Sequence, residues 1–390
     1  MPYCLVEEGE GDGGVRLFYR THGRGPVKVL LIVGLAGTLE SWGPQIQGLT
    51  GTDMPNDVEF GDGVIPCYEE GVEVCTFDNR GAGRSSVPVD KSGYSTRIMA
   101  KDAISLMDHL GWRKAHVFGH SMGGMIACKL ATMVPSRVSS LALLNVTGGG
   151  FECFPKFDMR TISIMFRFFR AKTPEKRAAV DLDTHYSKEY LDGAVGSTAR
   201  REILHQEYVK GLSESGLQSE YGFWGQANAC WTHKLTRKEI ELIRSAGFPV
   251  SIIHGRQDVV AQISHARNLA KKLKPAARMI ELHGGHLVSH ERLDEVNKAL
   301  WQLIRESELS SRSVSRPSST KRSYGYMETG MSIQKATVGK EISIPLMDTI
   351  LDRLNLCMWY FFGWFMLAVE HGRRLIGGPT AIKVANTPFM

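Results

Sequence analysis

A serine between two glycines, at the junction of a strand-like and a helix-like segment, is the most constraining feature of this sequence. The five residues Gly119-His120-Ser121-Met122-Gly123 follow the β-rich run 114–118 and precede an apolar stretch of helical character. A serine at so tight a turn takes a strained backbone conformation, and side chains two positions before and after it would collide with neighbouring backbone. Gly119 and Gly123 meet that requirement. The pattern therefore predicts a nucleophile held at the end of a strand.

Two later residues suit the roles of partners to this serine. A serine hydroxyl becomes an effective nucleophile when a histidine accepts its proton and a carboxylate orients that histidine. In sheets that carry this turn, the acid follows the serine in the chain and the histidine comes last. Asp258 lies just past the apolar run 249–253, and His286 lies on a glycine-flanked loop after residues 279–282. We expect Ser121, Asp258 and His286 to form a catalytic triad.

Other residues compete for the roles of acid and base. The strand after the nucleophile helix ends in Asn145, where some sheets of this kind place the acid, but an amide cannot carry the charge that stabilises an imidazolium. His283 and His290 lie close to His286, which we prefer because two glycines precede it directly. We expect His120 to point away from the reaction and to pack or form a hydrogen bond locally.

These features resemble the α/β-hydrolase family, and the resemblance covers residues 15–307. Residues 78–85, Asp-Asn-Arg-Gly-Ala-Gly-Arg-Ser, and residues 34–37, Gly-Leu-Ala-Gly, are similar to two loops of that family. The resemblance implies an α/β fold with a mostly parallel, doubly wound sheet and an inserted helical cap. It also implies an oxyanion hole formed by the N–H groups of Leu35 and Met122, which would stabilise negative charge on the reacting oxygen.

Details of these loops refine the expectation. Val33 stands where many members of the family carry a histidine, so the loop loses a polar brace but keeps its N–H donor. Asp78, Arg80 and Ser85 are expected to brace the structure rather than to contact substrate. Most phenylalanines between residues 151 and 169 are expected to form the core of the cap.

The chain divides into five predicted regions. The hydrolase core takes residues 1–147 and 247–306, and the helical cap takes residues 148–246, where strand patterns nearly vanish. Residues 307–340 have the serine-rich, basic composition of a flexible linker. Residues 341–390 form a hydrophobic C-terminal extension.

The apolar segment 356–369 of that extension is predicted to contact a membrane. As a helix its fourteen residues would span about 21 Å, which is short of the roughly 30 Å hydrocarbon core, so a clean single crossing is not expected. Its tryptophan and tyrosine rings, with Arg373 and Arg374 beyond them, suit a lipid interface. Packing onto the protein's own surface, or onto a protein partner, is the alternative explanation.

Composition excludes several other classes of protein. With 390 residues, 43% of them hydrophobic, the chain can build a large core. The net charge of +6 comes without an arginine-rich stripe, which argues against nucleic-acid binding. The seven cysteines are odd in number and lack paired spacing, which argues against a disulfide framework and a zinc site. Residues 1–14 lack an apolar signal segment, so we expect an unsecreted protein in a reducing, cytoplasmic compartment.

The expected activity is hydrolysis of a carboxylic ester of a small, apolar or lipid-like substrate through an acyl-enzyme, with no cofactor and no metal. Two alternatives stay open. The chain could be a ligand-sensing protein that signals through movement of its cap onto a partner, or an acyltransferase that uses the same triad. The sequence identifies neither the substrate nor a protein partner.

Overall fold

The computed structural model describes residues 2–7, 14–57, 71–153, 155, 158–215, 217–314 and 384–385. The predicted membrane-contacting segment 356–369 and all but the first residues of the predicted linker lie outside this part of the chain, as does nearly all of the predicted extension. Within the described ranges, no helix combines the length and the apolar character needed to cross a bilayer. The described cysteines are all free thiols: Cys4, Cys75, Cys128, Cys153 and Cys230.

An eight-stranded sheet forms the centre of the fold, in the order β1-β2-β4-β3-β5-β6-β10-β11. The strands are β1 (Tyr3–Glu7), β2 (Val15–His22), β3 (Val27–Ile32), β4 (Val72–Phe77), β5 (Ala115–His120), β6 (Val138–Leu144), β10 (Val250–Gly255) and β11 (Ala277–Leu282). Strand β2 is antiparallel to both of its neighbours, and all the other pairings in this sheet are parallel. The predicted mostly parallel α/β sheet is confirmed.

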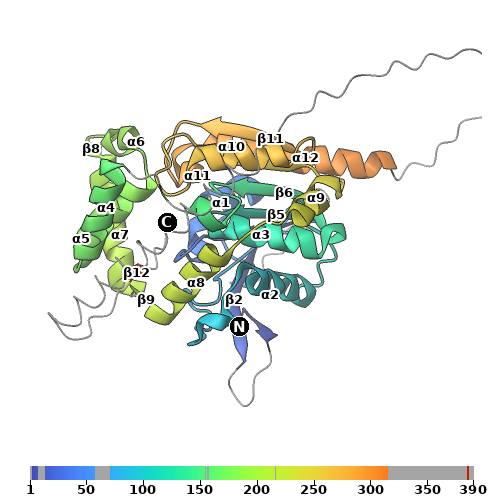
Figure 1. Ribbon diagram of the computed structural model, residues 1–390, viewed down its shortest axis with the longest axis horizontal. Coiled ribbons are helices and arrows are strands. Elements are labelled where there is room, and N and C mark those ends of the chain that lie inside the picture. The colour runs from blue at the N-terminus through green and yellow to red at the C-terminus, as the bar shows by residue number, and fades with distance from the viewer. Residues whose placement is uncertain are drawn as a thin grey trace, which may run out of the picture. The chain divides into compact units, whose positions relative to one another are not determined.

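Alternate residues of the central strand β3 face two separate cores. Leu30 and Ile32 pack with α2, α3 and α10 on one face, whereas Val29 and Leu31 pack with α1 and α12 on the other. These helices are α1 (Gly43–Thr50), α2 (Thr96–His109), α3 (Met122–Met133), α10 (Ile263–Lys272) and α12 (Leu293–Val314) (Figure 1). Because helices cover both faces of the sheet, its central strands are hydrophobic at nearly every position.

Helix α2 begins and ends at residues with a clear capping role. Ser95 caps α2, since its hydroxyl oxygen accepts a hydrogen bond of 3.1 Å from the backbone N–H of Ile98. The helix ends before Gly111, whose φ of +68° belongs to the left-handed region. Helix α12 is much longer, with 22 residues that end at Val314.

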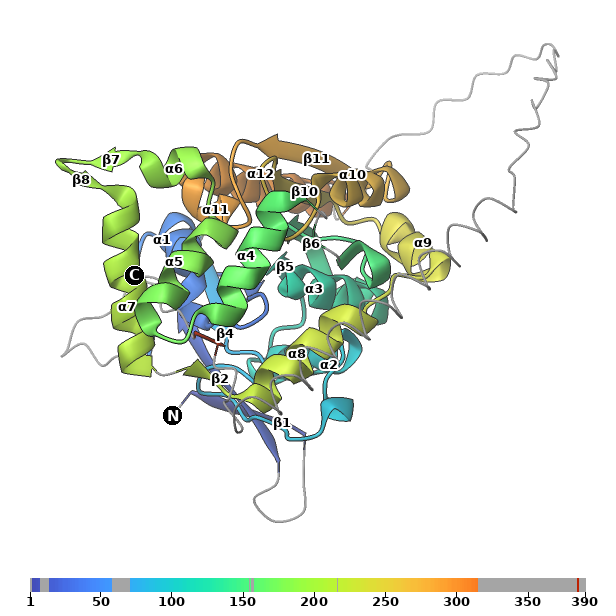
Figure 2. The same ribbon diagram turned by 60° about the vertical axis from the view of Figure 1, so that its left-hand side comes forward.

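Between β6 and β10 the chain leaves the sheet and forms a second layer. Helices α4 (Met159–Arg170), α5 (Pro174–His185), α6 (Lys188–Asp192) and α7 (Arg200–Ser215) pack on one another at one side of the sheet in Figure 1, and come forward in Figure 2. We call α4–α7 the cap helices. Their own small core contains Leu182, Tyr186 and Tyr208.

The two helices that follow pack on the core rather than with the cap helices. Helix α8 (Glu220–Thr232) lies beside the short 3₁₀ turns at Lys91–Gly93 and Gly150–Cys153, and α9 (Arg237–Ser245) packs on α3 (Figures 1 and 2). Before α8, β9 (Leu217–Gln218) pairs with β12 (Val384–Ala385), so a late piece of the chain returns to this region. The remaining short pair is β7 (Ala194–Val195) with β8 (Thr198–Ala199).

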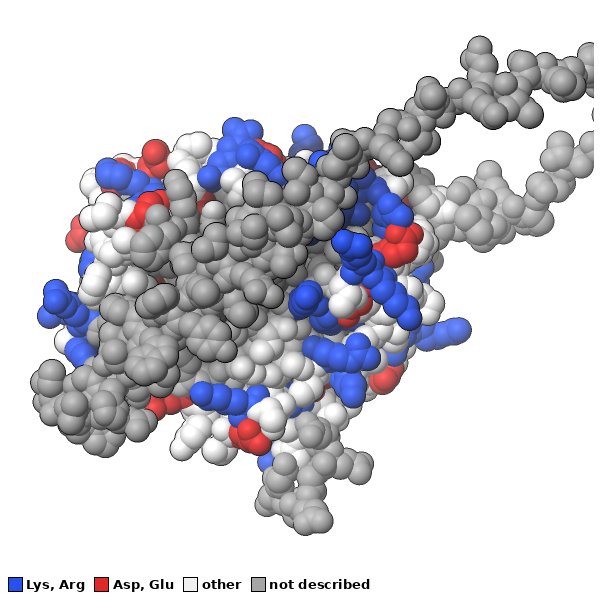
Figure 3. Space-filling model, viewed as in Figure 1, with Lys and Arg blue, Asp and Glu red and all other residues white. Residues whose placement is uncertain are grey.

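The surface carries charges of both signs. On the coloured part of the face in Figure 3, acidic side chains lie among the lysines and arginines, and the basic side chains of that part do not form one continuous stripe. Exposed arginines often have acidic partners, as in the pair that Arg267 makes with Glu281. This distribution agrees with the modest net charge of +6.

The loop after β4 braces the structure, as the sequence predicted for Asp78, Arg80 and Ser85. The guanidinium of Arg80 donates from Nε and Nη2 to the two carboxylate oxygens of Asp102, at 2.6 and 2.7 Å. Both side chains are almost fully buried, with 2% and 4% exposed. Asp78 accepts hydrogen bonds from the N–H groups of Leu39 and Arg84, and burial raises its pKa to about 6 although those two bonds lower it.

The buried pair generates a stability prediction. Arg80→Met should lower the free energy of unfolding by about 3 to 5 kcal/mol, because it leaves Asp102 buried without its partner. The matched control is Arg267→Met, which removes an equally bidentate but half-exposed arginine and should cost about 1 kcal/mol or less. Urea unfolding monitored by circular dichroism measures both; equal losses in the two variants would contradict the bracing role.

Candidate active site

Ser121 occupies a sharp turn between β5 and α3. Its backbone has φ 54° and ψ −120°, and its N–H donates to the carbonyl of Leu144 at 2.8 Å. A Cβ atom on Gly119 would lie 2.3 Å from the carbonyl oxygen of Gly123, and one on Gly123 would lie 2.0 Å from that of Ile32. Because these contacts are with backbone atoms, no side-chain rearrangement relieves them. The two glycines are therefore required by the turn, as the sequence predicted.

Backbone strain gathers at this end of the sheet. Among the described residues, the non-glycine positions with positive φ are Ala36 (60°), Ser121 (54°) and Asn145 (50°). They follow the adjacent strands β3, β5 and β6, and all three line the same pocket. Strained residues persist where the surrounding structure holds them, which is common at functional sites. The carboxyl ends of these three strands are therefore the candidate site.

Asp258 and His286 are brought together at this edge. Nδ1 of His286 lies 2.8 Å from Oδ2 of Asp258, which also accepts a bond of 2.7 Å from the side-chain amide of Asn145. The other carboxylate oxygen accepts from the N–H groups of Val260 and Ala261, at 2.8 and 2.9 Å. The side chain of Asp258 is fully buried, and each of its carboxylate oxygens contacts two hydrogen-bonding groups of the protein.

These contacts determine the charge of Asp258. Burial by itself would raise the pKa of the carboxyl group, but His286, His254 and the amide of Asn145 favour the ionised form and lower the pKa to about 2. The carboxylate therefore stays negative at neutral pH. Since it binds Nδ1 of His286, Nε2 remains available for a second partner.

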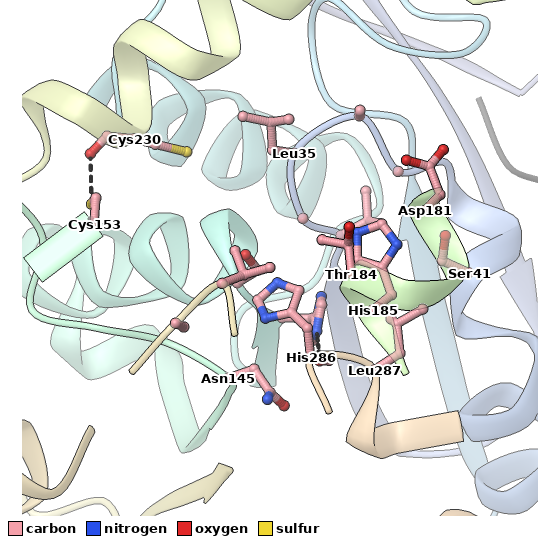
Figure 4. A pocket seen from close by; sticks show the side chains of 18 of the residues that line it. Leu35, Ser41, Asn145, Cys153, Asp181, Thr184, His185, Cys230, His286 and Leu287 are labelled. Carbon is pink, nitrogen blue, oxygen red and sulfur yellow. Dashed lines mark hydrogen bonds between the residues drawn. The ribbon is translucent and has the colours of Figure 1, made fainter. Parts of the chain in front are cut away.

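Ser121 and His286 line one pocket of about 380 Å³. Figure 4 shows His286 projecting into the middle of this space, with residues of the core and of the cap helices around it. The apolar lining comes from Val33, Leu35, Met125, Phe168, Phe223, Val260, Ala261 and Leu287. The structure thus places the predicted nucleophile and the predicted base against the same cavity, with Asp258 buried behind the base.

The two predicted oxyanion-hole residues flank the serine. Leu35 lines the pocket, and Met122 is the first residue of α3, where backbone N–H groups lack intrahelical acceptors. In the described ranges the N–H groups of Leu35 and Met122 have no hydrogen-bond acceptor. Both donors are therefore available to a ligand.

A glutamine from α8 holds the loop that contains Leu35. The side chain of Gln226 accepts a hydrogen bond of 2.9 Å from the N–H of Ala36 and donates one of 2.9 Å to the carbonyl of Arg80. Asn79 donates to the carbonyl of Val33 at 2.9 Å. These two amide side chains brace the loop that contains Leu35. At Val33 of this loop, many family members carry a histidine instead.

Two further side chains at the site, Asn145 and His120, have contacts that the sequence did not predict. Asn145 is not the acid, but it orients Asp258 and also donates to the carbonyl of Gly285 at 3.1 Å. His120 was expected to form local contacts, yet its Nε2 lies 2.8 Å from the carbonyl oxygen of His286. Only the position of Asn145 at the end of a strand signals such a role in the sequence.

The competing histidines have structural partners. His283 contacts Gln257 and Arg292 near the surface, whereas Nε2 of His290 lies 2.9 Å from the carbonyl oxygen of Ser41.

Across the described ranges, no group of three or more His, Cys, Asp or Glu side chains has an arrangement that could hold a metal ion.

Comparison with known proteins decides the family. The family model described as alpha/beta hydrolase fold matches residues 28–293. The chain belongs to this family. The match extends from β3 to the start of α12.

Individual relatives agree with this assignment. One, named "Putative carbamate hydrolase RutD", from Variovorax paradoxus (strain S110), is 34% identical over 130 residues, 33% of this chain and 42% of that protein. The chain spans less than half the length of several of the relatives that carry this name. A protein of the same name from Caulobacter sp. (strain K31) is 31% identical over 72% of this chain and 91% of its own. The enol-lactonase from Burkholderia xenovorans LB400 has a similar fold, with a TM-score of 0.56 at 22% identity, over 75% of this chain and 97% of that chain.

The pKa of Asp258 gives a prediction for stability against pH. Its pKa in the folded protein, about 2, lies below its ordinary value of 3.8, so ionised Asp258 stabilises the fold above about pH 4 and this contribution is lost as the pH falls toward 2. The difference in unfolding free energy between wild type and Asp258→Asn should shrink as the pH falls from about 4 toward 2. Urea titrations at each pH measure it; a difference that grows over this range would refute the assignment.

Proposed function

We propose that this protein hydrolyses a carboxylic ester through a covalent acyl-enzyme, with Ser121 as nucleophile, His286 as general base and Asp258 as the acid that orients the base. The observation that carries the proposal is the 2.8 Å contact between Asp258 and Nδ1 of His286, made behind a pocket that both His286 and Ser121 line. The family assignment supports it, because a hydrolase needs such a group of side chains.

The reaction follows from the roles of these groups. Nε2 of His286 takes the proton of the Ser121 hydroxyl, and the serine oxygen attacks the ester carbonyl. The N–H groups of Leu35 and Met122 stabilise the negative oxygen that forms, and each such donor is typically worth about 3 kcal/mol of barrier. The protonated His286 then donates its proton to the departing alcohol. In the second half, His286 activates water, which releases the acid and frees Ser121.

Asp258 and the cap helices serve this chemistry indirectly. The ionised Asp258 keeps the proton of neutral His286 on Nδ1 and stabilises the imidazolium when it forms. We propose that residues 1–147 and 247–306 act as the catalytic core and residues 148–246 as the cap, since the cap helix α5 supplies pocket-lining residues. A water-poor pocket strengthens every electrostatic contact within it.

A carbamate is the second candidate substrate. The relatives described above are named carbamate hydrolases, and a carbamate presents a carbonyl that the same nucleophile and oxyanion donors can engage. Release of an amine or ammonia rather than of an alcohol alone distinguishes the two substrates.

The proposed nucleophile can be tested directly. Ser121→Ala should reduce kcat on p-nitrophenyl esters by a factor on the order of 10⁶, because the triad acts as a unit, and should abolish labelling by a fluorophosphonate. Stopped-assay turnover and gel-based labelling measure the two effects. Normal turnover by this variant would reject the mechanism.

The choice of base has its own prediction. His286→Ala should lose kcat by at least about 10⁴, whereas His283→Ala, which changes a histidine near the surface only three residues away, should stay within about threefold of wild type. Steady-state kinetics on the same esters compares them. A larger loss in the His283 variant would reassign the base.

A further inference from the structure

One face of the cap helix α5 supplies polar side chains to the pocket. The residues are spaced by four, seven and eight positions, so they share a face of the helix: Arg177, Asp181, Thr184 and His185. Figure 4 shows Asp181, Thr184 and His185 gathered with Ser41 on one side of His286, while Cys153 and Cys230 lie on the other side. The pocket therefore has a polar end, formed by α5 and Ser41, and an apolar end.

Arg177 and Asp181 form a buried ion pair with unused hydrogen-bonding capacity. Nε of Arg177 lies 3.0 Å from each carboxylate oxygen of Asp181, and the side chains are 7% and 8% exposed. The guanidinium lies 3.7 Å over the ring of Phe168. In the described ranges, the two Nη groups of Arg177 donate to no acceptor. Nη groups that donate to no protein acceptor are free to donate to a ligand that enters the pocket.

Neighbouring side chains add further hydrogen-bonding groups at the polar end. The hydroxyl of Ser41 has no hydrogen bond with any described residue, and that of Thr184 donates to the carbonyl of Val180 but can still accept. Nδ1 of His185 is buried and forms no hydrogen bond, and burial, with the neighbouring His286 and Arg177, lowers the pKa of His185 to about 3, so its ring is neutral. Donors and acceptors thus lie side by side.

The apolar end differs in chemistry. Met125 and the two cysteines, which belong to one apolar cluster, offer carbon and sulfur surface, and burial raises the pKa of Cys153 to about 11, so its thiol stays neutral. Such a surface suits an alkyl chain.

The position of His286 relates these ends to the two halves of an ester. The alcohol oxygen leaves with the proton of His286, so the alcohol part of the substrate must lie next to that imidazole. The ring of His185 is stacked against it, with 6.0 Å between ring centroids and 29° between planes. The polar end therefore adjoins the side on which the alcohol departs.

We infer that the polar end formed by Arg177, Asp181, Ser41, Thr184 and His185 binds a hydroxyl-bearing alcohol part, so that the preferred substrates are monoesters of a small polyol with an apolar acyl chain. This inference rests on the proposed esterase function and specifies its substrate class.

The balance of donors and acceptors favours hydroxyl groups over a carboxylate. A hydroxyl both donates and accepts, so it can take an N–H from Arg177 and donate to Asp181 or Thr184. A carboxylate only accepts, and it would place a second negative charge beside Asp181 while sharing the single positive charge of Arg177. The pair is already neutral as a whole, which matches a neutral polar group.

The test compares two esters that differ only in the alcohol: 1-decanoylglycerol and propyl decanoate. For wild type, kcat/KM should favour the glycerol ester by at least about tenfold. The double variant Arg177→Met with Asp181→Leu removes both charges together, so neither is left buried alone. It should lower this preference by about tenfold or more, to near unity.

A matched control lies on the same helix outside the pocket. Asp183 of α5 pairs with Arg201 at 2.7 Å, at a partly exposed position. The double variant Arg201→Met with Asp183→Leu should keep the wild-type preference. Thermal unfolding and the rate of fluorophosphonate labelling confirm that each variant is folded with a competent serine.

Binding separates failure of this inference from failure of the esterase proposal. The ether 1-O-decylglycerol is not hydrolysed, and its affinity for Ser121→Ala should fall at least about tenfold when Arg177→Met and Asp181→Leu are added. The polar-end assignment would be overturned if the preference for the glycerol ester, or the affinity for the ether, were the same with and without the Arg177–Asp181 pair. If wild type hydrolysed neither ester while ether binding still depended on the pair, the esterase function would be rejected and the polyol site retained.

Discussion

Direct contact between backbone atoms at the Ser121 turn is the constraint on which the rest of this site depends. Strand β5, the start of α3 and the end of β3 approach so closely that a Cβ on Gly119 or Gly123 would lie 2.3 or 2.0 Å from a carbonyl oxygen. This contact holds the serine at a positive φ of 54° at the end of β5. It also places the first N–H groups of α3 beside the serine, where a negative oxygen would form.

Neighbouring parallel strands complete the site because their carboxyl ends meet at the same edge. Strand β6 ends in Asn145, and the loops after β10 and β11 carry Asp258 and His286. The amide of Asn145 joins them, since it binds the carboxylate of Asp258 and the backbone of the His286 loop. A buried carboxylate is stable only with such donors around it, which explains why Asp258 stays ionised in a fully buried position.

The pocket contrasts two ways of burying charge. Asp258 has protein donors at both oxygens, whereas the Arg177–Asp181 pair in α5 keeps donors and acceptors that no described protein group uses. The first arrangement prepares a histidine for proton transfer, and the second leaves hydrogen-bonding capacity for something that enters the pocket. The cap helices have their own small core. Substitutions of cap residues that face the pocket can therefore leave the packing of the sheet unchanged.

The sequence alone determined the turn and the triad candidates, because each has a local signature, whereas the parallel sheet was expected from the resemblance to the α/β-hydrolase family. A glycine-serine-glycine spacing, an acid after an apolar run and a histidine after two glycines are all read within a few residues. Only the tertiary structure decided the roles of Asn145, His120 and Gln226, since their partners lie far away in the chain, up to 190 residues for Gln226. The polar end of the pocket was also invisible in the sequence, because a charged helix face is usually solvated and only packing shows which face is buried.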